Sequence, residues 1–189
     1  MKRILTLLVV IALASLVFTG CSGMGIGPSN DYVLHVNCGA TNPYVDMEGN
    51  LWVPDQPMND DVTWGHLDGN YAVRNPEEIV GSKCPEIYLT ERHSLSKYVF
   101  NVPDGEYLVR LHFAETYTGI MGAGERVFAV SVNDEEVFPA VDPFEEGGGL
   151  FKPVIKEVDD VEPANGKITI GFKENIQSPQ INGIEIIGQ

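Results

Sequence analysis

The chain has 189 residues, and its 27 Asp and Glu outnumber its 12 Lys and Arg, which gives a formal net charge of −15. A protein that binds the nucleic-acid backbone needs a basic surface, so this charge excludes nucleic acid as a partner. Hydrophobic residues at 43% and charged residues at 21% are typical of a globular chain, and the length predicts a single domain.

Residues 1–20 have the pattern of a secretory signal. Lys2 and Arg3 precede an apolar run over residues 4–18, which is shorter than the roughly 20 residues of a membrane span. The run ends in Val17-Phe18-Thr19-Gly20-Cys21-Ser22. This segment resembles the lipobox of bacterial lipoproteins, with Phe18 where Leu is usual.

The lipobox resemblance implies a lipid-anchored protein. Cys21 would become the acylated N-terminus, carrying palmitate-type chains that hold the protein on a membrane of the bacterial cell envelope, on the periplasmic or surface side. Residues 21–30 would then be the lipidated cysteine and a flexible Gly-rich tether, and residues 31–189 the folded domain. The alternative is an ordinary cleaved signal with a free cysteine nearby.

Two further cysteines, Cys38 and Cys84, lie within the expected domain. Outside the cytoplasm such a pair can form a disulfide. Two buried free thiols that behave as small hydrophobic side chains are the alternative. No Cys or His stands at metal-ligand spacing from either residue, so we expect no metal site there.

Residues 42–74 show no regular period apart from a brief strand predicted at residues 51–53. Such a long irregular stretch indicates a functional loop region or strands that the pattern does not reveal. Next along the chain, Asn75-Pro76-Glu77-Glu78 can cap at most one short helical turn, with Pro at the first helical position.

The second half of the chain has the two-residue period of β-strands. Apolar and polar residues alternate over residues 107–113, 128–132 and 168–172. Turn-forming residues separate these runs, and a Gly-rich loop over residues 115–125 links the first two. No segment of ten residues carries a helical stripe, so the sequence predicts an all-β antiparallel sandwich.

Catalytic and metal-binding motifs are scarce. The sequence has no G-x-S-x-G elbow, H-E-x-x-H pair, phosphate loop or EF-hand loop. Glu91 and Glu115 are the weak candidates for a glycosidase-type acid/base pair. The acidic runs at residues 142–146 and 157–162 are expected to be solvated turns and strand ends, with bound Ca²⁺ as the alternative.

Aromatic residues offer a better-supported chemistry. Sugars lay their C–H faces on aromatic rings while polar side chains bind their hydroxyls. Candidates for such a site are Trp52, Trp64, Tyr71 and Tyr117, with Asn70, His93 and Gln177 as polar partners. For each tryptophan, packing in the core is the alternative.

A set of motifs in order along residues 32–188 resembles the malectin and malectin-like domains. The most specific are Leu89-Thr90-Glu91-Arg92-His93 and Leu111-His112-Phe113-Ala114-Glu115-Thr116-Tyr117; the others are Val36-Asn37-Cys38-Gly39, Val45-Asp46, Gly49-Asn50-Leu51-Trp52, Gly124-Glu125-Arg126-Val127-Phe128, Asp142 and Ile181-Asn182-Gly183-Ile184-Glu185-Ile186. The resemblance implies a jelly-roll-like β-sandwich that binds carbohydrate through loops at one end. In the eukaryotic malectin the ligand is a glucose disaccharide.

The sugar-binding residues that the resemblance implies are only partly retained. Tyr71 and Tyr117 keep the family's tyrosines, whereas His93, Thr118 and Gln177 stand where the family has a tyrosine, an aromatic residue and an aspartate. We therefore expect non-catalytic binding of an oligosaccharide or other glycan, without a cofactor. The alternative is a structural or protein-interaction lipoprotein that binds an envelope partner and has lost sugar binding.

Overall fold

The structure is a computed structural model that describes residues 31–74, 79 and 81–189. The predicted signal at residues 1–20, Cys21, the tether and the expected turn at residues 75–78 lie outside the described residues.

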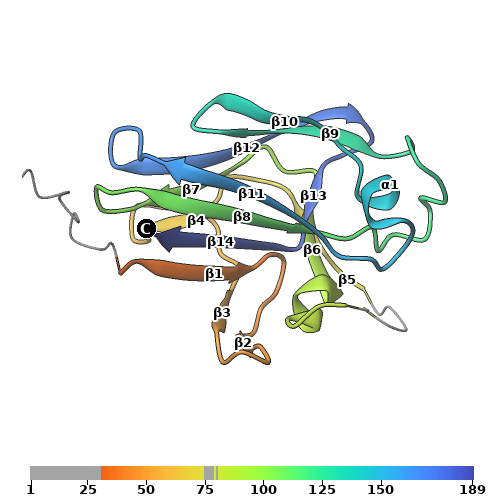
Figure 1. Cartoon of the computed structure of the whole chain (residues 1–189), viewed down its shortest axis with the longest axis horizontal. Coiled ribbons are helices and arrows are strands. Elements are labelled where there is room, and N and C mark those ends of the chain that lie inside the picture. Colours follow the sequence, from red (N-terminus) through yellow and green to blue (C-terminus); the bar gives the residue numbers. More distant parts are fainter. Residues whose placement is uncertain (1–30, 75–78, 80) are drawn as a thin grey trace, which may run out of the picture.

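Strands dominate the described chain (Figure 1). In chain order they are β1 (Val33–Asn37), β2 (Tyr44–Val45), β3 (Leu51–Pro54), β4 (Trp64–His66), β5 (Asn70–Val73), β6 (Thr90–His93), β7 (Lys97–Asn101), β8 (Tyr107–Phe113), β9 (Val127–Val132), β10 (Glu135–Val141), β11 (Val154–Val161), β12 (Lys167–Ile176), β13 (Gln180–Ile181) and β14 (Gly183–Gly188). The helical segments are a 3₁₀ turn, η1 (Pro85–Leu89), and a short helix, α1 (Pro143–Gly147).

The strands form two packed sheets and a small third one. The first sheet has the order β11-β8-β14-β1-β3-β2, the second β10-β9-β12-β7-β4, and the third β13-β6-β5. Strand pairs are antiparallel, with a parallel pairing of β1 and β3 as the exception that the described residues show. The predicted all-β sandwich is confirmed.

The main core lies between the two large sheets. Along β8, Tyr107, Val109, Leu111 and Phe113 are fully buried, as the two-residue period predicts. They pack against apolar residues of the facing sheet, including Phe128 of β9. The predicted strands at residues 107–113, 128–132 and 168–172 are therefore confirmed.

A second, smaller core covers the outer face of the six-stranded sheet. There η1 packs Ile87 and Tyr88 over Trp52 of β3, together with Cys84 and Ala114. Trp52 is 1% exposed and Trp64 is 8% exposed, so core packing, the alternative to sugar stacking, holds for both tryptophans. Gly183 packs closely beneath this core, because a Cβ there would lie 2.9 Å from Ile87 Cδ1 and 3.0 Å from Trp52 Cζ3.

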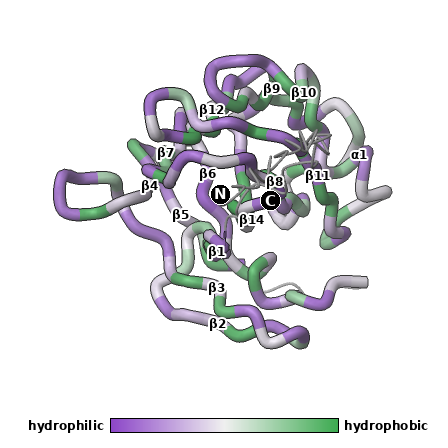
Figure 2. Tube along the Cα trace, turned by 60° about the vertical axis from the view of Figure 1, so that its left-hand side comes forward, coloured by the Kyte–Doolittle hydropathy of each residue, from purple (hydrophilic) through white to green (hydrophobic). Residues whose placement is uncertain are grey.

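The region that shows no period in the sequence, residues 42–74, contains four strands, β2 to β5, and β3 confirms the strand predicted at residues 51–53. Each has only two to four residues, which is too short to display a two-residue alternation. Figure 2 shows the β2–β3 hairpin at the margin of the molecule, where hydrophobic and hydrophilic segments alternate along the tube.

Cys38 and Cys84 are free, buried thiols in the structure. Cys38 belongs to the main core and Cys84 to the smaller core on the other side of the six-stranded sheet. The disulfide alternative is thus not realised, because a sheet separates the two clusters. Burial raises the pKa of the Cys38 thiol well above its ordinary value, which disfavours the reactive thiolate.

The start of β1 and the C-terminus lie at one end of the sandwich, and α1 and the loop that follows β8 lie at the other (Figure 1). Within the described part of the chain, no helical segment has the length and apolar character needed to span a bilayer.

Candidate functional site

The small sheet β13-β6-β5 carries four of the residues singled out from the sequence: Asn70, Tyr71, Glu91 and His93. In its register Asn70 lies opposite His93, and His93 lies opposite Gln180. Side chains of paired residues share a face of the sheet, and neighbours along a strand alternate between faces. One face therefore presents Asn70, His93 and Glu91, and the other presents Tyr71 and Arg92.

Glu91 is the buried centre of the first face, with 1% of its surface exposed. One carboxylate oxygen accepts a 2.7 Å hydrogen bond from Arg74 Nη2, and the other accepts a 2.8 Å bond from the Thr116 hydroxyl. These bonds join the end of β5, the middle of β6 and the loop after β8. Charge-assisted bonds of this kind hold the three segments in fixed positions.

A second buried carboxylate, Glu115, fixes the Gly-rich loop at both ends. It accepts a 2.7 Å bond from Arg126 Nε and a 3.0 Å bond from the Tyr117 backbone amide. Burial raises the pKa of Glu115, although the neighbouring Arg126 opposes this rise. Arg126 Nη1 also donates to the Ser178 carbonyl, which connects the loop to the segment before β13.

Tyr117 stands half exposed on this frame, with 45% of its surface accessible. The Arg74 guanidinium lies over its ring, 5.2 Å from the centroid. A Cβ at Gly119 would lie 2.4 Å from the Tyr117 ring, so the loop needs glycine there to fold beside the ring. Thr118 is exposed between these two residues.

His93 and Gln177 border the same frame. His93 is partly exposed, and its Nδ1 lies 3.1 Å from the Ser94 hydroxyl. Desolvation lowers the pKa of His93, aided by Arg74 and Arg126 and opposed by Glu91, so the imidazole is neutral at pH 7. Gln177 is exposed with a positive φ of 61° and precedes Ser178, which binds Arg126.

Tyr71 lies apart from these residues. Its register partner is Arg92, which points into the core to form a 2.6 Å ion pair with Asp55. Tyr71 is 60% exposed and lines a hollow of about 460 Å³ with the loop at residues 39–44. The structure thus groups His93, Tyr117, Thr118 and Gln177 but places Tyr71 on the opposite face of β5.

The glutamates considered as an acid/base pair, Glu91 and Glu115, have all four carboxylate oxygens occupied by hydrogen bonds. They act as framework residues that order the loop. The acidic run at residues 142–146 has a similar role, because Asp142 caps α1 at Glu145 N and accepts a bond from Gly124 N. No group of three His, Cys, Asp or Glu side chains suited to a metal ion occurs in the described part.

Three further residues of this frame were not singled out by sequence reasoning: Arg74, Thr116 and Arg126. Thr116 and Arg126 belong to motifs that carried the family resemblance, and this is the signal that could have found them. Arg74 sits in the region without a period, where nothing in the sequence distinguishes it from a surface arginine.

Comparison with known proteins identifies the family. A family model described as the malectin domain matches residues 32–188. The chain belongs to the malectin domain family. Its match to the receptor-like protein kinase ANXUR2 of Arabidopsis thaliana is 26% identical over 168 residues, which is 84% of this chain and 19% of that protein. The match covers less than a fifth of the length of each curated relative.

Parts of several solved structures superpose well on this domain. The β-glucuronidase of Bacteroides uniformis matches with a TM-score of 0.74 and 26% identity, over 84% of this chain and 18% of that chain. The plant receptor-like kinase FER matches with a TM-score of 0.68 and 21% identity, over 82% of this chain and 48% of that chain. At this identity the likeness to FER shows a shared fold.

Proposed function

We propose that this malectin domain binds a neutral glycan without catalysing a reaction. The observation that carries the proposal is the half-exposed Tyr117 ring, which the Glu91–Arg74 and Glu115–Arg126 pairs hold in place. A fixed aromatic face loses little conformational entropy when a sugar stacks on it. Neutral His93, Asn70 and Gln177 would bind hydroxyls around the ring.

Tyr71 has a separate part in this proposal. Because it lies on the other face of β5, it would contact a chain that wraps around this edge strand, rather than share one sugar ring with Tyr117. Thr118 offers a hydroxyl in place of an aromatic ring, so the glucose disaccharide of malectin is not the expected ligand. The match to a β-glucuronidase supports a role with carbohydrate, since the name of that enzyme states that it acts on glucuronides.

A glycan array probed with the purified protein tests this proposal. We expect binding to neutral oligosaccharides that Tyr117→Ala abolishes, because the stacking face is removed. Thr63→Ala, an exposed residue outside the site, is the control and should bind like the parent. If no glycan binds the parent protein, the proposed function is wrong.

We also propose that the domain is exported and tethered by a lipidated Cys21. The receptor kinase ANXUR2 carries its similar domain extracellularly, and the chain enters the sandwich at the end opposite α1 and the Tyr117 loop (Figure 1). A tether at that end would leave the Tyr117 face directed away from the membrane. Intact-mass measurement on membrane fractions, with and without globomycin, tests the anchor; an unlipidated soluble protein would contradict it.

Binding to a protein of the envelope is the second candidate, and the β2–β3 hairpin favours it. Val45, Met47 and Leu51 are between 54% and 73% exposed there, an unusual density of large apolar side chains on a surface. A solved structure of FER holds it with the peptide RALF23 and the protein LLG2. This candidate is supported if the protein binds no glycan on the array, one protein co-purifies consistently with it, and Met47→Ser abolishes that co-purification.

A further inference from the structure

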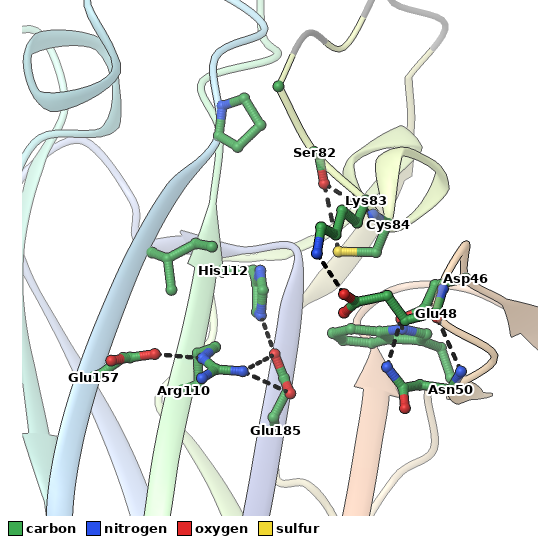
Figure 3. Close-up of a pocket in the computed structure, with 14 residues that line it drawn as sticks. Asp46, Glu48, Asn50, Ser82, Lys83, Cys84, Arg110, His112, Glu157 and Glu185 are labelled. Carbon is green, nitrogen blue, oxygen red and sulfur yellow. Dashed lines mark hydrogen bonds and ion pairs between the residues drawn. The ribbon is translucent and has the colours of Figure 1, made fainter.

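A hollow of about 400 Å³ lies on the outer face of the six-stranded sheet, and it shares no lining residue with the site around Tyr117 (Figure 3). β8, β11 and β14 form its floor, the turn at residues 46–50 forms one wall, and residues 81–84 form another. Its volume falls within the range of small-molecule sites, about 300 to 1,000 Å³.

The floor residues Glu157 of β11, Arg110 of β8 and Glu185 of β14 are register neighbours. Their row continues through His35 of β1 to Trp52 of β3. Arg110 Nε lies 2.5 Å from Glu157, and Nη1 lies 3.2 Å from both oxygens of Glu185. The charges of Glu157, Arg110 and Glu185 alternate, so the three side chains fix each other's orientation.

The walls are also held by an ion pair and by hydrogen bonds to a carboxylate. Lys83 Nζ lies 2.5 Å from Glu48, across the mouth of the hollow. Asp46 accepts hydrogen bonds from the backbone amides of Glu48 and Asn50 and from the side chains of Asn50 and Trp52, so its carboxylate is fully used. The turn that carries Glu48 and Asn50 is therefore rigid before any ligand arrives.

Several hydrogen-bonding atoms of these pairs remain unused. In the described part of the chain, no hydrogen bond engages Arg110 Nη2, Glu157 Oε2, Glu48 Oε2 or Asn50 Oδ1. The free donor and acceptor atoms thus belong to side chains that are either neutral or already in an ion pair. Such pairs match hydroxyl groups, each of which donates one bond and accepts others. Pro153 and the half-exposed Ile155 add an apolar surface beside them.

We propose that this hollow is a second binding site, which takes a neutral mono- or disaccharide. An anionic ligand is disfavoured because four carboxylates and only two cations line the hollow. A cationic ligand is disfavoured because Lys83 and Arg110 already pair with Glu48, Glu157 and Glu185. In addition, every carboxylate oxygen of Asp46 and Glu185 already accepts hydrogen bonds. The ligand that satisfies the unused atoms is uncharged and rich in hydroxyls.

Amide chemical-shift mapping of the purified protein tests the proposal, with methyl glucoside, maltose and cellobiose as neutral probes and glucuronate and glucosamine as charged ones. We expect concentration-dependent shifts at Glu48, Lys83 and Arg110 with at least one neutral probe. Ile155→Trp fills the hollow from an exposed position and should weaken these shifts at least about tenfold. Val33→Trp, an equally exposed change on β1, is the matched control and should leave them unchanged.

This outcome is separable from the function proposed above. Tyr117→Ala should leave the shifts at Glu48, Lys83 and Arg110 intact while removing binding at the Tyr117 face. The proposal is overturned if no neutral probe shifts these amides, if the shifts persist in Ile155→Trp, or if only glucuronate or only glucosamine produces them.

Discussion

Glu185 shows how single side chains hold this fold together. It is 6% exposed, and it accepts hydrogen bonds from His112 Nε2 at 2.7 Å and from His35 and Arg110 at 3.2 to 3.3 Å. Burial alone would raise the pKa of Glu185, but the bonds from His112 and His35 and the charge of Arg110 outweigh burial and hold it well below its ordinary range. The ionised carboxylate is therefore part of the folded state.

Replacing Glu185 by Gln should lower the free energy of unfolding at pH 7 by about 3 kcal/mol, because Arg110 loses a buried partner. The depressed pKa stabilises the parent above the ordinary glutamate value of about 4.3, and this stability is lost as pH falls below it. Urea denaturation between pH 7 and 3 should show a steep decline for the parent. A variant with the same decline would contradict the assignment to Glu185.

At the scale of elements, the hydrogen bonds and ion pairs of single carboxylates position the loops that sequence patterns leave undefined. The loop after β8 is held by Glu115 and Arg126, and the β2–β3 turn by the Asp46 carboxylate. The strands are stabilised by burial of alternating apolar side chains, whereas the positions of these loops depend on a few polar contacts each. Their contribution is therefore open to test by single substitutions.

Arg126→Met should destabilise the protein by about 3 kcal/mol at pH 7, because Glu115 would be left buried and unpaired. Since burial already raises the pKa of Glu115, protonation should relieve part of this cost, and the loss should be smaller at pH 5 than at pH 7. Thermal unfolding at the two pH values measures this difference. An equal loss of stability at both pH values would show that the unpaired Glu115 carboxylate is not the cause of the destabilisation.

Asp46→Ala should loosen the β2–β3 turn, with a loss of about 1 to 2 kcal/mol from its hydrogen bonds to backbone amides. Faster amide hydrogen exchange is expected at Glu48 and Asn50, because their backbone N–H groups donate hydrogen bonds to Asp46. Asp60→Ala, at an exposed position outside the turn, serves as the control. Unchanged exchange at Glu48 and Asn50 would refute the role of Asp46.

At the scale of the whole molecule, the sequence was informative where burial repeats along a strand. The strands β8, β9 and β12 are six to ten residues long and bury apolar side chains at every second position of their alternating parts, so their existence could be predicted. Of the short strands β2 to β5, only β3 was predicted, at residues 51–53; the others depend on pairing with residues far away in the chain, such as Trp64 opposite Phe100. The grouping of His93 with Tyr117 and its separation from Tyr71 likewise depend on strand register.

The net charge of −15 is a property of the whole chain. Mutual repulsion of carboxylates should destabilise the folded state at low ionic strength, and salt screens this repulsion. We expect the thermal midpoint to rise by a few degrees as NaCl increases from about 20 to 200 mM, since the exposed ion pairs that salt weakens contribute little. A fall in the midpoint would show that attractive pairs dominate.

Isothermal titration calorimetry with a neutral oligosaccharide selected on the array tests the central claim most directly. The account predicts a dissociation constant near the millimolar range, about −4 kcal/mol, for the parent and for the Thr63→Ala control. Tyr117→Ala should reduce the affinity at least about tenfold, because one stacking face is lost. Equal affinity in parent and Tyr117→Ala, or no heat from any neutral glycan, would contradict it.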